Sequence, residues 1–95
     1  MKPKSIIKSI GKLAKEMKRL AARAGKEYAP VVDSIVRSRT KDTRHIEQTL
    51  DGLLDFCWDP ATLRLFKKLC RYYYTIDPKA TVEYINAYRN IWDEK

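Results

Sequence analysis

The stretch that decides the fold is residues 59–92, which read DPATLRLFKKLCRYYYTIDPKATVEYINAYRNIW. An Asp-Pro pair occurs in it twice, beginning at Asp59 and at Asp77. Asp accepts hydrogen bonds from the unpaired N–H groups at a helix start, and Pro fits the first helical position because its φ is already set. Apolar residues recur at helical spacing after each pair. The stretch therefore predicts a C-terminal helical hairpin with its turn at residues 75–77.

Residues 1–25 predict a basic amphipathic helix. Gly25 is suited to cap its C-terminus, because glycine enters the left-handed region without steric cost. We expect the apolar stripe of this helix to pack on the hairpin, against Phe66 and Ile85. The stripe recurs at intervals of three and four residues and comprises Ile6, Ile10, Leu13, Met17, Leu20 and Ala24.

The middle of the chain predicts a short helix from Pro30, a polar loop at residues 37–43 and a further helix to about Cys57. Asp42 or Thr43 is the expected N-terminal cap of that further helix. Its apolar stripe comprises Ile46, Leu50, Leu53 and Cys57, and its other side carries Glu47, Asp51 and Asp55. We expect these carboxylates to be solvated or to pair with a basic element. The 95 residues thus predict one all-α domain, a small bundle of four to five helices.

The formal net charge is +8, and all of the excess lies in the first half. Residues 1–45 hold 13 Lys and Arg against 4 Asp and Glu, whereas residues 46–95 hold 7 against 8. Such asymmetry favours a polyanionic or acidic partner, although a solvated basic face is the simpler interpretation. The candidate phosphate contacts are Lys8, Lys12, Lys15, Lys18, Arg19, Arg23, Arg37, Arg39, Lys41 and Arg44.

Three kinds of binding fit this pattern. The first is a nucleic-acid-associated accessory protein that contacts phosphates. The second is a protein-interaction module that forms a homo-oligomer or docks an acidic protein, with Trp58, Tyr72, Tyr74 and Trp92 as candidate interface residues. The third is peripheral membrane binding through the first helix, which is weakened because its apolar face carries no Trp or Phe.

The sequence indicates no enzyme, cofactor site or metal site. His45 is the only histidine and lies at a predicted helix start, where a positive charge is disfavoured. Cys57 and Cys70 lie on apolar stripes, as buried small residues do, and they match no zinc spacing. No run of 18 apolar residues is present, so we expect no membrane span. Two cysteines and no secretory signal favour the cytoplasm.

Overall fold

The computed structural model describes the backbone of residues 3–93 and the side chains of residues 10–93. Over that range the chain is all-α, with no strand, as the sequence predicted. None of the described helices is long and apolar enough to cross a membrane. The elements are α1 (Pro3–Ser38), α2 (Thr43–Leu54), α3 (Pro60–Tyr74), α4 (Pro78–Tyr88) and a final π-helical turn, η1 (Arg89–Asp93).

The predicted hairpin is α3 and α4, and both Asp-Pro pairs act as helix starts. Asp59 accepts a hydrogen bond from the backbone N–H of Thr62 at 3.0 Å, and Asp77 accepts one from that of Ala80 at 3.0 Å. Each proline follows its capping aspartate as the first helical residue. Local chemistry alone therefore fixes where these two helices begin.

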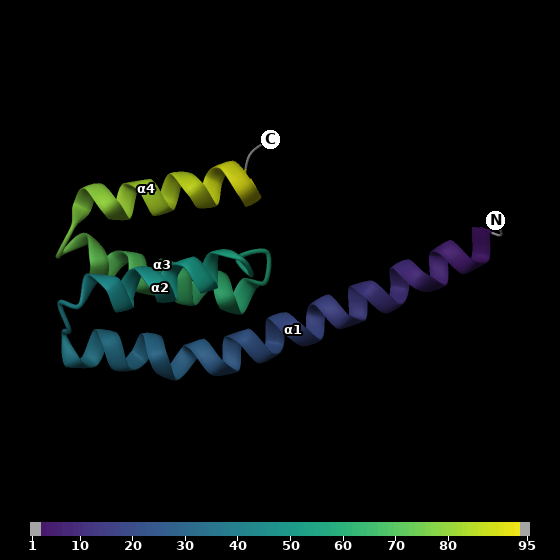
Figure 1. Ribbon diagram of the computed structural model, residues 1–95, viewed down its shortest axis with the longest axis horizontal. Helices are drawn as coiled ribbons and strands as arrows, with labels where there is room; N and C mark the ends of the chain where they lie inside the picture. The colour runs from purple at the N-terminus through teal and green to yellow at the C-terminus, as the bar shows by residue number, and fades with distance from the viewer. Residues whose placement is uncertain (1–2, 94–95) are drawn as a thin grey trace.

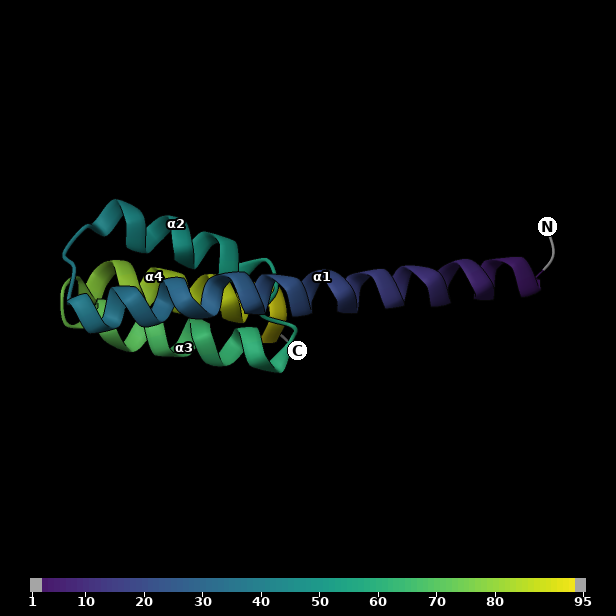
Figure 2. The same cartoon turned by 90° about the horizontal axis from the view of Figure 1, so that it is seen from below.

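Helix α3 is the centre of the bundle and contacts α1, α2 and α4. Helices α2 and α3 lie between α1 and α4, one on each side (Figures 1 and 2). Helix α4 is the least buried, since Thr81 is its only buried residue. The core is built from α1, α2 and α3, and its fully or nearly fully buried members include Val32, Ile35, Ile46, Leu50, Leu53, Phe66, Leu69 and Tyr73.

Helix α2 packs closely on α1 at Gly52. A Cβ atom added to Gly52 would overlap the Tyr28 hydroxyl and ring, so the absence of a side chain at Gly52 makes room for the Tyr28 side chain of α1. Asp42 caps α2 by accepting from the backbone N–H of His45 at 3.2 Å. The helix ends at Leu54, earlier than the predicted end near Cys57, and the cysteine is buried in the turn that follows.

The predicted end of the first helix at Gly25 is wrong, because α1 continues to Ser38 with Pro30 inside it. Gly25 keeps helical dihedral angles, and the space beside it is filled by α3, with Thr62 Oγ1 3.8 Å from where a Cβ would stand. Pro30 removes one backbone hydrogen bond, and α1 bends where it lies along the bundle (Figure 1).

The predicted polar loop at residues 37–43 is shorter than expected. Arg37 and Ser38 belong to α1, and only residues 39–42 connect it to α2. Arg39 takes the left-handed conformation that ends the helix, with φ of 53°. This is the position usually taken by glycine, so the sequence pattern misplaced the stop at Gly25.

The predicted packing of the first apolar stripe on Phe66 and Ile85 is also wrong. Residues 10–20, here called the projecting segment, extend away from the bundle (Figure 1). The cause is helix length: α1 has 36 residues and α3 has 15, which at 1.5 Å per residue gives about 54 Å against about 22 Å. Only residues 21–38, here called the covered segment, find neighbours in the bundle.

Candidate interaction surface

The projecting segment carries a large exposed apolar stripe. Ile10 and Leu13 are each 61% exposed, Met17 is 45% exposed and Leu20 is 51% exposed. In a regular helix Ile10 and Ile35 lie within about 20° of each other around the axis. Ile35 is only 2% exposed and belongs to the core. The exposed stripe is therefore the continuation of the face that the covered segment buries.

The spacing of this stripe is that of a coiled-coil seam. Ile10, Leu13, Met17, Leu20 and Ala24 are separated by three, four, three and four residues. This mean period of 3.5 residues keeps one narrow seam facing a partner helix. The sequence showed the seam as an apolar face. It did not show that α1 is longer than its neighbours, which is why the seam is uncovered.

The basic residues of the projecting segment lie on its other side. Lys15 lies opposite the stripe, and Lys12, Lys18 and Arg19 lie about 120–140° around the helix from its centre. Arg19 pairs with Glu16 at 3.5 Å, and the pair is exposed. The segment thus presents an apolar seam on one side and a row of cations on the other.

The structure does not bring the ten predicted phosphate contacts into one patch. Arg39 follows Lys12 by 27 positions, which along a helix is about 40 Å. Two of the arginines in the covered segment have carboxylate partners: Arg23 with Glu27 at 3.2 Å and Arg37 with Asp33 at 2.9 Å. Arg39, Lys41 and Arg44 are exposed around the α1–α2 connection, and the side chain of Lys8 lies outside the described residues.

The four predicted interface aromatics are also dispersed. Trp58 is half-buried in the α2–α3 connection, and Tyr72 donates a hydrogen bond to the Thr40 carbonyl at 2.8 Å. Trp92 is partly exposed and donates through Nε1 to the Leu54 carbonyl at 2.7 Å. Tyr74 is 55% exposed. Two of these residues therefore hold loops and helix ends together, while Tyr74 presents its ring to solvent.

Tyrosine hydroxyls donate hydrogen bonds to Glu47 and Asp51, two of the three carboxylates that the sequence placed along one side of the second helix. Tyr73 is fully buried and donates to the Glu47 carboxylate, and Tyr84 donates to Asp51 at 2.8 Å. Burial first, and then these carboxylates, raise the pKa of both tyrosines well above the usual value. The predicted solvation or cation pairing is corrected for Glu47, which joins α2 to α3. Asp51 accepts from Tyr84 of α4 but stays exposed, and Asp55 is exposed as predicted.

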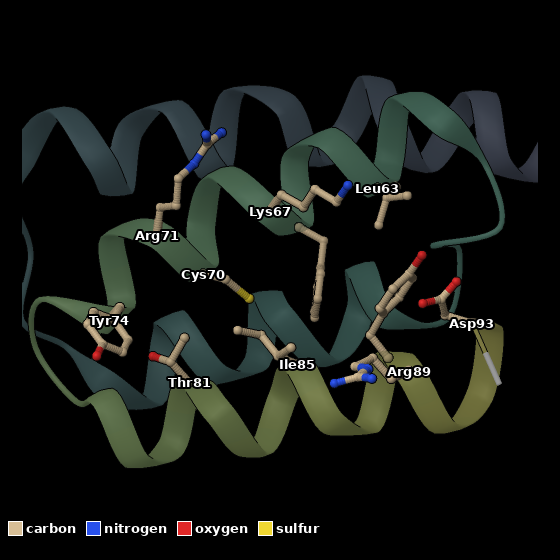
Figure 3. A pocket seen from close by; sticks show the side chains of 11 residues that line it. Leu63, Lys67, Cys70, Arg71, Tyr74, Thr81, Ile85, Arg89 and Asp93 are labelled. Atoms are coloured by element: carbon tan, nitrogen blue, oxygen red, sulfur yellow. The ribbon is translucent and has the colours of Figure 1, made fainter.

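An apolar groove of about 660 Å³ lies between α3 and α4. Cys70 points into it from α3, and Ile85 faces it from α4 (Figure 3). Phe66 and Tyr88 both line the groove, with ring centroids 5.9 Å apart. Burial raises the pKa of the Cys70 thiol to about 12, so it is held in the unreactive protonated form.

No protein-family model, curated protein or solved structure matches this chain. Among residues 10–93, no three His, Cys, Asp or Glu side chains lie together as a metal site would require.

Proposed function

We propose that this protein is a non-enzymatic interaction module that docks a helical protein partner through the projecting segment of α1. The observation that supports this is the single apolar stripe of α1, which is core in the covered segment and exposed in the projecting one. A contiguous exposed apolar surface of this kind marks an interaction site more often than scattered apolar residues do.

The energetics favour a partner. Fully burying a Leu, Ile or Met side chain contributes about 1.5–3 kcal/mol, and the stripe holds four that are 45–61% exposed. A helix without tertiary contacts is marginal at roughly 12–15 residues. A partner helix laid on the seam would stabilise the projecting segment through this burial.

The composition of the apolar face favours a protein over a lipid surface. Membrane-surface helices carry cations on the polar face and commonly Trp or Phe on the opposite, apolar face. The described stripe consists of Ile, Leu, Met and Ala, with no aromatic residue, and this composition weakens anchoring at a bilayer interface.

A pair of matched double variants tests the proposal. Leu13→Gln with Met17→Gln removes the stripe, and Lys12→Gln with Lys15→Gln changes the opposite face by the same number of glutamines. Tagged full-length protein is co-expressed with an untagged copy and purified in the presence of nuclease. We expect the proteins that co-purify with the wild type and with the lysine variant to be absent when the stripe variant is purified. The same bound proteins in all three samples would refute docking through the stripe.

A second candidate function, nucleic-acid association, is supported by three exposed lysines on the projecting segment. Within the part of the chain that the structure describes, Lys12, Lys15 and Lys18 have no carboxylate within 4 Å. Binding to duplex DNA should weaken with salt, and Lys12→Gln with Lys15→Gln should reduce the slope of log K against log salt by about 2. Binding that is unaffected by salt would exclude this candidate.

A cytoplasmic location is part of the proposal, supported by the free thiols of Cys57 and Cys70.

A further inference from the structure

We propose that the apolar groove between α3 and α4 binds a long-chain fatty acid. The carboxylate lies between Lys67 and Arg89, and the chain runs along Cys70 and Ile85. The groove measures about 660 Å³, within the range of about 300–1,000 Å³ that is typical of small-molecule sites. It lies on the bundle, away from the projecting segment, so fatty-acid binding is a second function, separate from the docking proposed above (Figure 1).

The middle of the groove is lined by apolar side chains that the protein itself covers only in part. Phe66 and Cys70 of α3 are 2% and 5% exposed, whereas Ile85 of α4 is 39% exposed. Cys70 and Ile85 both face the space between the two helices (Figure 3). An aliphatic chain in this space would shield Ile85 from water, and the gain grows with the apolar area that the chain covers. These residues therefore favour a hydrocarbon chain as the occupant.

Two cations flank the groove near one end, one on α3 and one at the end of α4. Phe66 and Tyr88 have ring centroids 5.9 Å apart, and Lys67 and Arg89 directly follow these residues in the chain. Among the described residues, neither cation has a carboxylate within 4 Å. Asp93 also lines the groove, so the formal charge at this end is +2 from the cations and −1 from Asp93, or +1. A single carboxylate complements this charge, whereas a phosphate monoester at about −1.5 to −2 would exceed it.

The lining gives the ligand one direction along the groove. Lys67 and Arg89 lie toward one end, and Tyr74 and Thr81 lie at the other end, next to the turn that joins α3 to α4 (Figure 3). Arg71 extends away from α4, which leaves this second half without a charge (Figure 3). Lys67 and Tyr74 are seven positions apart, or about 10 Å along α3. A carboxylate held by the two cations therefore places its hydrocarbon chain toward the turn.

Titration of the purified full chain with sodium laurate, followed by methyl NMR, tests the site. We expect saturable binding below the concentration at which laurate forms micelles. The largest shifts should occur at the methyl groups of Leu63 and Ile85, while those of Ile10 and Leu13 on the projecting segment stay in place. Dodecyltrimethylammonium, which has a hydrocarbon chain and a positive head, should bind at least roughly tenfold more weakly because its charge is repelled by the cations. Binding that does not saturate, equal shifts at Ile10 and Leu13, or equal affinity for the two compounds overturns the proposal.

Matched double variants test the two cations. Lys67→Gln with Arg89→Gln removes both from the groove. Lys12→Gln with Lys15→Gln removes the same charge from the projecting segment, and all four side chains are exposed, so both proteins should fold. We expect the groove variant to bind laurate roughly twofold to thirtyfold more weakly than the wild type, and the control variant to bind it equally well. The same affinity in both variants overturns the proposal. Shifts of the groove methyl groups that depend on protein concentration without laurate would show that a second copy covers the groove, and would overturn it as well.

Discussion

The covered and projecting segments of α1 carry the same apolar stripe in two different surroundings. In the covered segment Val32 and Ile35 are buried by α2 and α3, whereas in the projecting segment Ile10 and Leu13 face solvent. The difference comes from the length of the neighbouring helices and not from the local sequence. An amphipathic pattern therefore specifies which face of a helix will be buried, but not which molecule will bury it.

The largest expected effect comes from one substitution made in both segments. Ile35→Ala removes a core side chain that is 2% exposed and should lower the free energy of unfolding by about 2–5 kcal/mol. Ile10→Ala, at a residue 61% exposed, should change it by less than about 0.5 kcal/mol when the protein is dilute. Urea unfolding of both variants measures the difference. Equal losses at low concentration would mean that the stripe is buried within the monomer.

Alkaline pH should destabilise the bundle through its thiols. Burial raises the pKa of Cys70, and burial together with the neighbouring Cys70 raises that of Cys57, each from 9.0 to about 12. The folded state then keeps protons that the unfolded chain loses, so stability is full below pH 9 and falls as pH rises toward 12. The slope per thiol is about 1.4 kcal/mol per pH unit.

Replacing the cysteines provides the control for this pH dependence. Cys57→Ala with Cys70→Ala should flatten the fall of unfolding free energy between pH 9 and 11, measured by urea unfolding followed through Trp58 and Trp92. The raised pKa values of Tyr73 and Tyr84 act in the same direction at higher pH and persist in the variant. An unchanged slope would show that the thiols ionise equally well in the folded protein.

Local chemistry was predictable from the sequence, and long-range geometry was not. Asp59 and Asp77 correctly predicted two helix starts, because an N-terminal cap depends only on a residue three positions further along the chain. Gly25 gave a false stop because its backbone freedom permits a helix end without requiring one, and Arg39 supplied the real end with a positive φ. The all-α class was predictable because the helical spacing of apolar residues can be read directly from the sequence.

The residues of the candidate surface were predictable from the sequence, but their exposure was not. Within residues 10–24 the apolar stripe and the row of cations were identified correctly as two faces of one helix, while the side chains of Ile6 and Lys8 lie outside the described residues. Their exposure depended on α1 extending past α3, a property of how helices of unequal length align. The hydrogen bond from Tyr73 to Glu47 was missed for a similar reason, because the partners are 26 residues apart and on different helices.

Adjacent tyrosines sharpen the contrast between buried and exposed surface. Tyr73→Phe removes the hydroxyl that bonds the Glu47 carboxylate and should cost about 1.5–3 kcal/mol, as expected for a bond to a charged group. Tyr74 is 55% exposed, so Tyr74→Phe should stay within about 0.5 kcal/mol. Thermal or urea unfolding of the two variants gives the comparison. A Tyr73→Phe variant as stable as Tyr74→Phe would mean that the Glu47 contact contributes nothing to the fold.

Two glycines extend the comparison to the backbone, with smaller effects of opposite sign. Gly52→Ala places a methyl group against the Tyr28 hydroxyl and ring, so the Tyr28 side chain must leave its place, at a cost of about 1–3 kcal/mol. Gly11 has no atom within 4 Å of the same added carbon, and Gly11→Ala should instead favour the helix by about 0.5–1 kcal/mol. Circular dichroism should show this gain as higher helicity of the projecting segment, with no change in the unfolding of the bundle. Loss of helicity in Gly11→Ala would instead indicate that the glycine lies against another chain.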